Sequence, residues 1–346
     1  MLDPTCGSGA FLFAALNILE PLYEACLDRM QAFVDDLERS GTRTSSRKFA
    51  DFRRTLAEIE RHPNRRYFIL KSIMINNLYG VDIMEEAVEI CKLRLFLKLV
   101  AQIDKATELE PLPDIDFNIR PGNTLVGFAT LDDVKRTLDG TLGFGKGQVE
   151  RIVEDAEIVE RAFQKFHEMQ TEHGMDAREF TAAKQGLRTR LNRLADELNR
   201  YLAGEYGIDP GKPEAYNQWR ESHQPFHWFA EFFGIMQRGG FDVIIGNPPY
   251  VELKTPADYK TLGYQCETAG NLYALVLERC CTLVKHTGRQ GFIVPVSSVS
   301  TDRYGSLQRL LTSHELWYSS FDDRPSRLFD GLEHIRLTID IIGDSV

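Results

Sequence analysis

The 346-residue sequence has no Cys-x-x-Cys pair among its six cysteines, so it lacks the usual spacing of a zinc site or a redox pair. Cysteines scattered in this way are typical of a reduced cytoplasmic protein. No uninterrupted apolar run is long enough to span a membrane, and the first residues do not have the pattern of a signal peptide. We therefore expect a cytoplasmic protein with no metal site and no membrane contact.

Positive charge is also in deficit. The sequence has 41 Lys and Arg against 51 Asp and Glu, which gives a formal net charge of -10. This balance argues against bulk electrostatic capture of nucleic acid by this chain alone, so such a substrate would need a local basic groove or a separate basic domain. Hydrophobic residues make up 43% of the sequence, and its length allows one large domain or a domain with a sizeable insertion.

The most informative stretch is an apolar run at residues 241–245, followed by Gly246-Asn247-Pro248-Pro249-Tyr250. The run fits a buried strand of a parallel sheet. The two prolines must end the strand because they have no backbone N–H group. The chain therefore delivers an amide, two stiff residues and an aromatic ring to the carboxyl end of a strand, the edge at which open α/β sheets bind ligands.

These residue types suit a planar amino group. The side-chain carbonyl of Asn247 and the backbone carbonyl of Pro248 are two neighbouring acceptors, and Tyr250 has a face on which a flat ring can stack. The amine of a purine is a poor nucleophile because its lone pair is delocalised into the ring. Two acceptors that pull on its hydrogens would localise the lone pair as the amine attacks an electrophile. For this motif taken alone, a proline-rich turn with a core tyrosine is the structural alternative.

A second motif, Asp3-Pro4-Thr5-Cys6-Gly7-Ser8-Gly9, leads into a helical pattern. A Gly-x-Gly turn lets the backbone approach a ligand and directs helix N–H groups at it. The motif lacks the third glycine of the dinucleotide fingerprint and the Lys-Ser/Thr of a phosphate loop, so a plain strand-to-helix turn is the alternative. Strands usually have about five residues, yet only Met1 and Leu2 come before it. We expect the sequence to begin inside a sheet.

The remaining pattern alternates strands with helices. Residues 78–83 predict a short strand ending in Asp82, which is placed to accept hydrogen bonds from ribose hydroxyls or to cap the next helix. Residues 117–125 predict a third strand and its exit turn. Further strands are predicted at 291–295, 316–321 and 337–342. Helices are predicted at 11–33, 49–59, 85–100, 271–285 and 304–311, and Gly288 is expected to end the fourth of these.

Residues 131–238 differ from the rest because they are rich in charged residues at helical spacing. We interpret this segment as a helical insertion that is compatible with an antiparallel helix pair. Its basic stretch is interpreted as a solvated helix face, and comprises Lys184, Arg188, Arg190, Arg193 and Arg200.

Taken in order, these motifs resemble the S-adenosylmethionine-dependent DNA adenine-N6 methyltransferases, and most closely the large type II and type IIG restriction–modification class. Residues 271–273, 291–295 and 324–329 also resemble segments of that class. Four motifs carry most of the resemblance: the Asp3–Gly9 segment as the cofactor loop, Gly80-Val81-Asp82-Ile83 as the ribose-binding acid, Gly122-Asn123-Thr124-Leu125 as the third cofactor motif, and Asn247-Pro248-Pro249-Tyr250 as the catalytic motif.

The resemblance implies a Rossmann-like α/β fold of the class I methyltransferases. Its sheet would be mostly parallel and seven-stranded, with one antiparallel strand and a truncated first strand. The cofactor-binding half would be residues 1–130, the helical insertion 131–238 and the catalytic half 239–346. The implied reaction moves a methyl group from S-adenosylmethionine to the N6 atom of an adenine that is flipped out of double-stranded DNA.

The resemblance also assigns individual residues. Asn247 and Pro248 would hold the amine, Tyr250 would stack on the base, and Pro249 completes the catalytic motif. Asn123 stands where many relatives have an acid, so its contact with the cofactor adenine would be less selective. The cofactor-binding set consists of Asp3, Pro4, Thr5, Gly7, Gly9, Asp82, Ile83 and Asn123.

No target-recognition segment follows the last predicted strand. We therefore expect a separate target-recognition domain or partner subunit, within a restriction–modification or phage-defence system. One alternative is N-methylation of a protein glutamine, whose amide also fits Asn-Pro-Pro-Tyr, although the long insertion and residues 324–329 argue against it. The other is a non-catalytic subunit of a defence complex that binds the cofactor or DNA.

Overall fold

The structure is a computed structural model that describes residues 1–39, 49–105, 111–139, 146–171, 176–253, 260–322, 328–329 and 335–345. Most of the 324–329 segment lies outside these residues.

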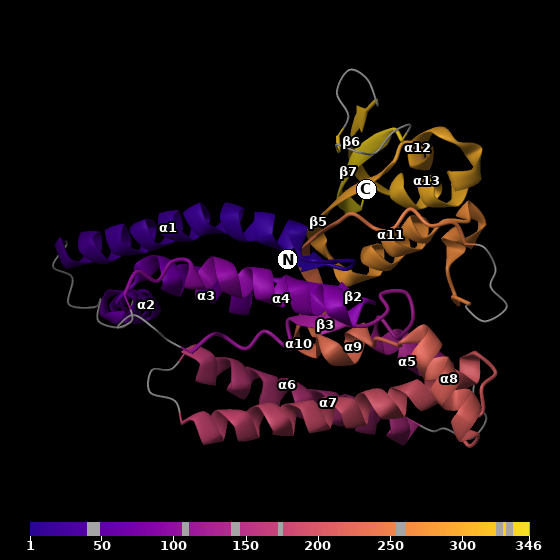
Figure 1. The fold of residues 1–346 in the computed structure, drawn as a ribbon, viewed down its shortest axis with the longest axis horizontal. Helices are drawn as coiled ribbons and strands as arrows, with labels where there is room; N and C mark the ends of the chain where they lie inside the picture. Colours follow the sequence, from indigo (N-terminus) through magenta and orange to yellow (C-terminus); the bar gives the residue numbers. More distant parts are fainter. Residues whose placement is uncertain are drawn as a thin grey trace.

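A seven-stranded sheet with the order β3-β2-β1-β4-β5-β7-β6 organises the fold (Figure 1). Neighbouring strands are parallel from β3 to β5, and β7 is antiparallel to both β5 and β6. These pairings confirm the predicted sheet, with one antiparallel strand and a first strand of only two residues. The strands are β1 (Leu2–Asp3), β2 (Tyr79–Asp82), β3 (Ile119–Pro121), β4 (Phe241–Gly246), β5 (Val284–Pro295), β6 (His314–Phe321) and β7 (Leu337–Ser345).

Helices cover both faces of the sheet. Successive strand residues point to opposite sides, so a strand with consecutive apolar residues packs against helices on both faces. Ile244 of β4 belongs to the core that contains α11 (Leu272–Leu283) and α13 (Gly305–Leu311), whereas Ile245 packs against the core of the first helices. The first helices, against which Ile245 packs, are α1 (Ala10–Arg39), α2 (Ala50–Arg61), α3 (Arg65–Asn76) and α4 (Glu85–Val100). The short helix α12 (Ser297–Ser300) precedes α13.

Helix α1 is longer than predicted and is long and apolar enough, by length and composition only, to cross a membrane. Its polar side is used within the protein. Glu24 forms an ion pair with Arg65 of α3, and Glu20 forms one with Arg66. The basic cluster at the start of α3 is therefore occupied by α1, so these contacts favour a role of α1 in packing.

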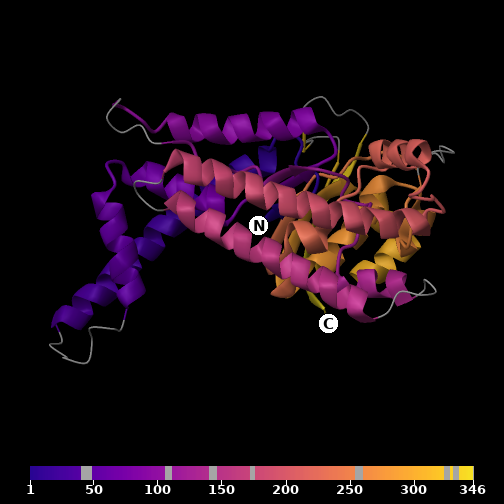
Figure 2. The same ribbon diagram turned by 90° about the horizontal axis from the view of Figure 1, so that it is seen from below.

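The segment between the two halves of the sheet is helical, as predicted. Helices α6 (Lys146–Thr171) and α7 (Ala177–Glu205) run side by side in both views (Figures 1 and 2). They are antiparallel, since Arg151 pairs with Glu197 and Arg193 pairs with Asp155. The other helices are α5 (Leu131–Asp139), α8 (Pro213–His223), α9 (Trp228–Glu231) and α10 (Phe233–Gln237). The boundaries at 130 and 238 stay predictions.

Two expectations need correction. Helix α11 ends at Leu283 and not near Gly288, because Val284 already pairs with Phe241 in the sheet and Gly288 lies within β5. The basic stretch of α7 is also not wholly solvated. The ammonium of Lys184 lies 2.7 Å from Asp116 Oδ2, and Lys92 of α4 lies 2.8 Å from Asp116 Oδ1. Asp116 therefore ties the insertion to the sheet domain.

The fully buried carboxyl of Asp340 on β7 generates a prediction about pH. Burial raises its pKa from 3.8 to about 7. The unfolded chain releases this proton at lower pH than the folded chain does, so stability should fall as pH rises from about 4 to about 7, by about 4 kcal/mol. Urea unfolding at a series of pH values measures the slope. Because burial also raises the pKa of Asp3 to about 7, we expect Asp340→Asn to remove only the part of the slope that Asp340 contributes, and an unchanged slope in this variant would contradict the assignment.

Candidate functional site

The turn between β1 and α1 is built by two glycines with positive φ angles, 49° at Gly7 and 79° at Gly9. The Gly7 N–H donates to Asp82 Oδ2 at 2.8 Å, and Asp82 Oδ1 accepts from the Met84 N–H at 3.0 Å. The carboxylate at the end of β2 thus holds the glycine turn in place. Apart from the chain neighbours of Gly7, no atom of the described residues lies within 4 Å of the position that a Cβ on Gly7 would take, so this side of the turn is open to a ligand.

Asp82 was expected to contact ribose or to cap the next helix. The residue that precedes α4 in the cap position is Met84, whose side chain makes no cap hydrogen bond. Asp82 instead bonds two residues ahead and across to the glycine turn, and its side chain is only partly buried. It keeps the position that suits a hydroxyl donor. Ile83, which follows it, is 44% exposed.

Asp3 joins the glycine turn to the Asn-Pro-Pro-Tyr motif. Its carboxyl group is 1% exposed and accepts from the Thr5 N–H at 3.1 Å. A Cβ on Gly246 would lie 3.1 Å from Asp3 Oδ1, so only a glycine fits comfortably before Asn247. Burial raises the pKa of Asp3 to about 7. The first and last sequence motifs therefore touch, because β1 and β4 are neighbouring parallel strands.

The Asn-Pro-Pro-Tyr motif leaves β4 at the same edge of the sheet. Asn247 is exposed, Pro248 is buried and Pro249 is exposed. Tyr250 folds back, and its hydroxyl lies 2.5 Å from Asn247 Oδ1 and 3.0 Å from the Ile293 carbonyl of β5. Its ring packs edge-on against Tyr273 of α11. The amide and the ring thus share one corner.

Asn123 has a structural role that the sequence did not reveal. It is 4% exposed, its Nδ2 donates to the His223 carbonyl at 2.9 Å, and its Oδ1 accepts from the Leu125 N–H at 3.0 Å. Its backbone N–H also donates to the Gln224 carbonyl at 3.0 Å. The amide therefore clamps the end of the helical insertion to the exit of β3. Its contact with a cofactor adenine stays a prediction.

Two further contributions to the site were missed at the sequence level. The Thr124 hydroxyl donates to the Pro4 carbonyl, which joins the third motif to the first. The Cys91 thiol of α4 fills the space under Gly9, since a Cβ there would lie 2.4 Å from its Sγ. Both partners are distant in sequence and chemically ordinary, so no local pattern marks them.

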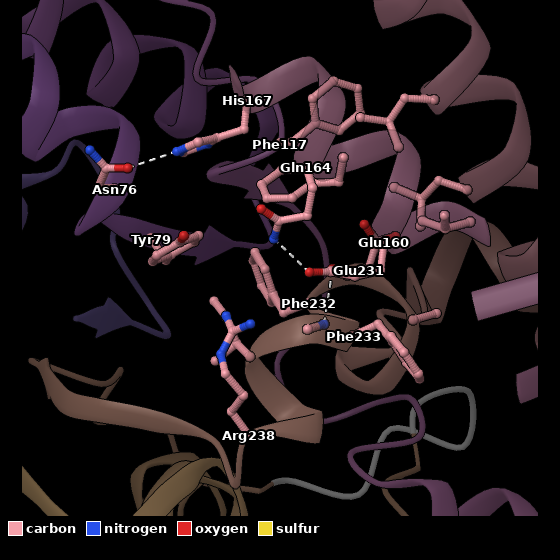
Figure 3. A pocket seen from close by; sticks show the side chains of 17 residues that line it. Asn76, Tyr79, Phe117, Glu160, Gln164, His167, Glu231, Phe232, Phe233 and Arg238 are labelled. Atoms are coloured by element: carbon pink, nitrogen blue, oxygen red, sulfur yellow. Dashed lines mark hydrogen bonds between the residues drawn. The ribbon is translucent and has the colours of Figure 1, made fainter. Parts of the chain in front are cut away.

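A cavity of about 200 Å³ lies elsewhere, at the amino-terminal edge of the sheet and against the insertion (Figure 3). Several of its polar groups are paired with one another. Glu160 accepts from the Gly234 N–H at 3.0 Å and from Gln164 at 2.7 Å, and His167 bonds Asn76 at 2.7 Å. This cavity is therefore a packing seam between insertion and sheet, on the side away from the glycine turn.

Comparison with known proteins agrees with this geometry. The family model described as Eco57I restriction-modification methylase matches residues 76–324. A Methanocaldococcus jannaschii protein named as a type II restriction enzyme and methyltransferase is 29% identical over 375 residues, which is 93% of this chain and 28% of that protein. The modification methylase CviBIII of Paramecium bursaria Chlorella virus NC1A is 32% identical over 87 residues, covering 25% of this chain and 22% of that protein.

Among solved structures, a protein of Listeria monocytogenes described as a class I S-adenosylmethionine-dependent methyltransferase covers 84% of both chains. Its sequence is 10% identical and its TM-score is 0.24, so this similarity supports no argument about function. The chain spans 28% of the length of the M. jannaschii relative.

The glycine turn generates a stability prediction. Gly9→Ala combines a positive φ with a clash against Cys91, so we expect it to lower the free energy of unfolding by about 2–4 kcal/mol. Gly7→Ala is the matched control, because it has only the φ penalty, about 1 kcal/mol. Urea denaturation of both variants measures the difference. Equal losses would mean that α4 does not pack closely under Gly9.

Proposed function

The chain belongs to the family of Eco57I restriction-modification methylases, and from this premise we propose that it methylates the N6 atom of adenine in double-stranded DNA. Membership of this methylase family implies S-adenosylmethionine as the cofactor. The observation that supports adenine as the target is the close approach of Gly246 to Asp3, where an added Cβ would lie 3.1 Å from Asp3 Oδ1, because it brings the start of the Asn-Pro-Pro-Tyr motif close to the start of the cofactor loop. An amide and a proline carbonyl at that point match an exocyclic amine.

The residues around the turn fit the cofactor. The open side of Gly7 admits its methionine end, the partly exposed carboxylate of Asp82 is an acceptor for ribose hydroxyls, and Ile83 offers an apolar face to its adenine. Asp3, Pro4, Thr5 and Gly9 shape this turn. When bound, S-adenosylmethionine supplies an electrophilic methyl group.

The Asn-Pro-Pro-Tyr corner acts on the target base. The carbonyl groups of Asn247 and Pro248 accept the two hydrogens of the amine and keep its lone pair on nitrogen, directed at the methyl donor. Tyr250 supports the ring of a base that has left the DNA stack. Neither acceptor is basic enough to hold a proton, so the proton released from the amine passes to solvent.

DNA recognition requires more than this corner. With a net charge of -10, the chain attracts DNA poorly by itself, so we propose that a target-recognition domain or a partner subunit supplies the sequence-specific contacts. We also propose that the protein works in a cytoplasmic restriction–modification or phage-defence system, in which such DNA contacts are needed.

Nucleoside analysis tests the proposal. The full-length protein, together with its target-recognition domain or partner subunit, is incubated with S-adenosylmethionine and unmethylated genomic DNA, the DNA is digested, and mass spectrometry identifies the methylated nucleoside. We expect N6-methyldeoxyadenosine from the wild type and at least a hundred-fold less from Asn247→Ala, because the variant loses an acceptor that acts on the transition state. Methylcytosine as the product, or an active Asn247→Ala variant, would refute the assignment.

Calorimetry tests the cofactor site separately. Asp82→Ala removes the acceptor that fixes the glycine turn and faces the ribose, so we expect S-adenosylmethionine to bind at least ten-fold more weakly. Glu85→Ala is the matched control, since Glu85 is an exposed acid in the first turn of α4, the helix that follows Asp82. Equal affinities of the two variants would remove Asp82 from the cofactor site.

A further inference from the structure

The Tyr250 hydroxyl lies between two carbonyl acceptors. Asn247 Oδ1 is 2.5 Å away on the same loop, and the Ile293 carbonyl is 3.0 Å away on the neighbouring strand β5. A hydroxyl has one proton to donate, so it can satisfy only one of them at a time. In the arrangement seen here the shorter contact occupies the oxygen of Asn247 that the proposed chemistry requires.

The amide has a second orientation in which the Tyr250 hydroxyl both donates and accepts a hydrogen bond. Rotating the Asn247 amide by half a turn exchanges Oδ1 and Nδ2 with little change in shape. Nδ2 then donates to the Tyr250 oxygen, and the hydroxyl donates to the Ile293 carbonyl. Asn247 is exposed, so its side chain has room for this rotation.

Resting on the proposed function, we infer that the Tyr250 hydroxyl is a positioning group that selects the orientation of the Asn247 amide. In the resting orientation it covers Oδ1. In the productive orientation the hydroxyl donates its hydrogen bond to the Ile293 carbonyl and accepts one from Nδ2. This arrangement turns Oδ1 toward the amine of the base. Tyr250 thus acts through Asn247, in addition to the stacking of its ring.

The surroundings keep the hydroxyl in place for this role. The Tyr250 ring packs edge-on against Tyr273 with their centroids 6.2 Å apart, and Tyr273 stacks on Tyr304. Burial raises the pKa of Tyr250 to about 12, so the hydroxyl keeps its proton at neutral pH. The ring is therefore fixed while the hydroxyl proton and the amide remain free to exchange partners.

Tyr250→Phe tests the inference because it keeps the ring and removes only the hydroxyl. We expect kcat for DNA methylation to fall about ten-fold, the equivalent of one orienting hydrogen bond. The KM for DNA and the affinity for S-adenosylmethionine should stay unchanged. Tyr273→Phe is the matched control, since its hydroxyl contacts Ser297 and not Asn247; its kcat should equal that of the wild type. A Tyr250→Phe rate at or above the wild-type rate would overturn the inference.

A second measurement does not need activity. In protein labelled with ¹⁵N-asparagine, the side-chain amide signal of Asn247 is identified by its loss in Asn247→Asp. We expect this signal to shift in Tyr250→Phe and not in Tyr273→Phe, and an unshifted signal would show that the hydroxyl does not hold the amide. If the full-length protein with its target-recognition domain or partner subunit methylates no DNA, the proposed function fails, whereas this signal still decides whether the hydroxyl orients Asn247.

Discussion

The parallel pairing of β1 with β2 and β4 is the interaction on which the rest of the site depends. Leu2 pairs with Tyr79 on one side and with Ile244 on the other, and the Met1 carbonyl accepts from the Tyr79 N–H. This strand of two residues lies next to the central strand β4. The chain runs outward from this pair in both directions, so the turns after β1 and β4 leave the same edge of the sheet. Without this pairing the glycine turn and the Asn-Pro-Pro-Tyr corner would not meet.

The site combines a rigid part with an adjustable part. The glycine turn is braced by Asp82, by the Cys91 thiol beneath it and by the bond from Thr124 to Pro4. Asn247, in contrast, projects from the end of a strand, and its side chain is hydrogen-bonded to the Tyr250 hydroxyl. A firm cradle beside a rotatable amide suits a reaction in which one partner stays bound and the other has to enter from DNA.

The helical insertion is connected to this site and is not a passive appendage. Its last segment bonds to Asn123 through the carbonyls of His223 and Gln224, and its long helix α7 reaches Asp116 through Lys184. One contact lies at the exit of β3 and the other just before β3. The insertion therefore holds β3 at both ends.

The sequence by itself determined the fold class, the order of the elements and the two motifs that meet at the sheet edge. These features are local, because glycine and proline impose their backbone geometry and apolar periodicity reports burial wherever they occur. The tertiary structure alone decided that Asn123 binds the insertion, that Asp3 touches Gly246, that β5 begins at Val284 and that Tyr250 bonds Asn247 and Ile293. Such contacts join residues with ordinary local signals, and whether a polar atom is used internally or left for a ligand depends on what the rest of the chain packs against it.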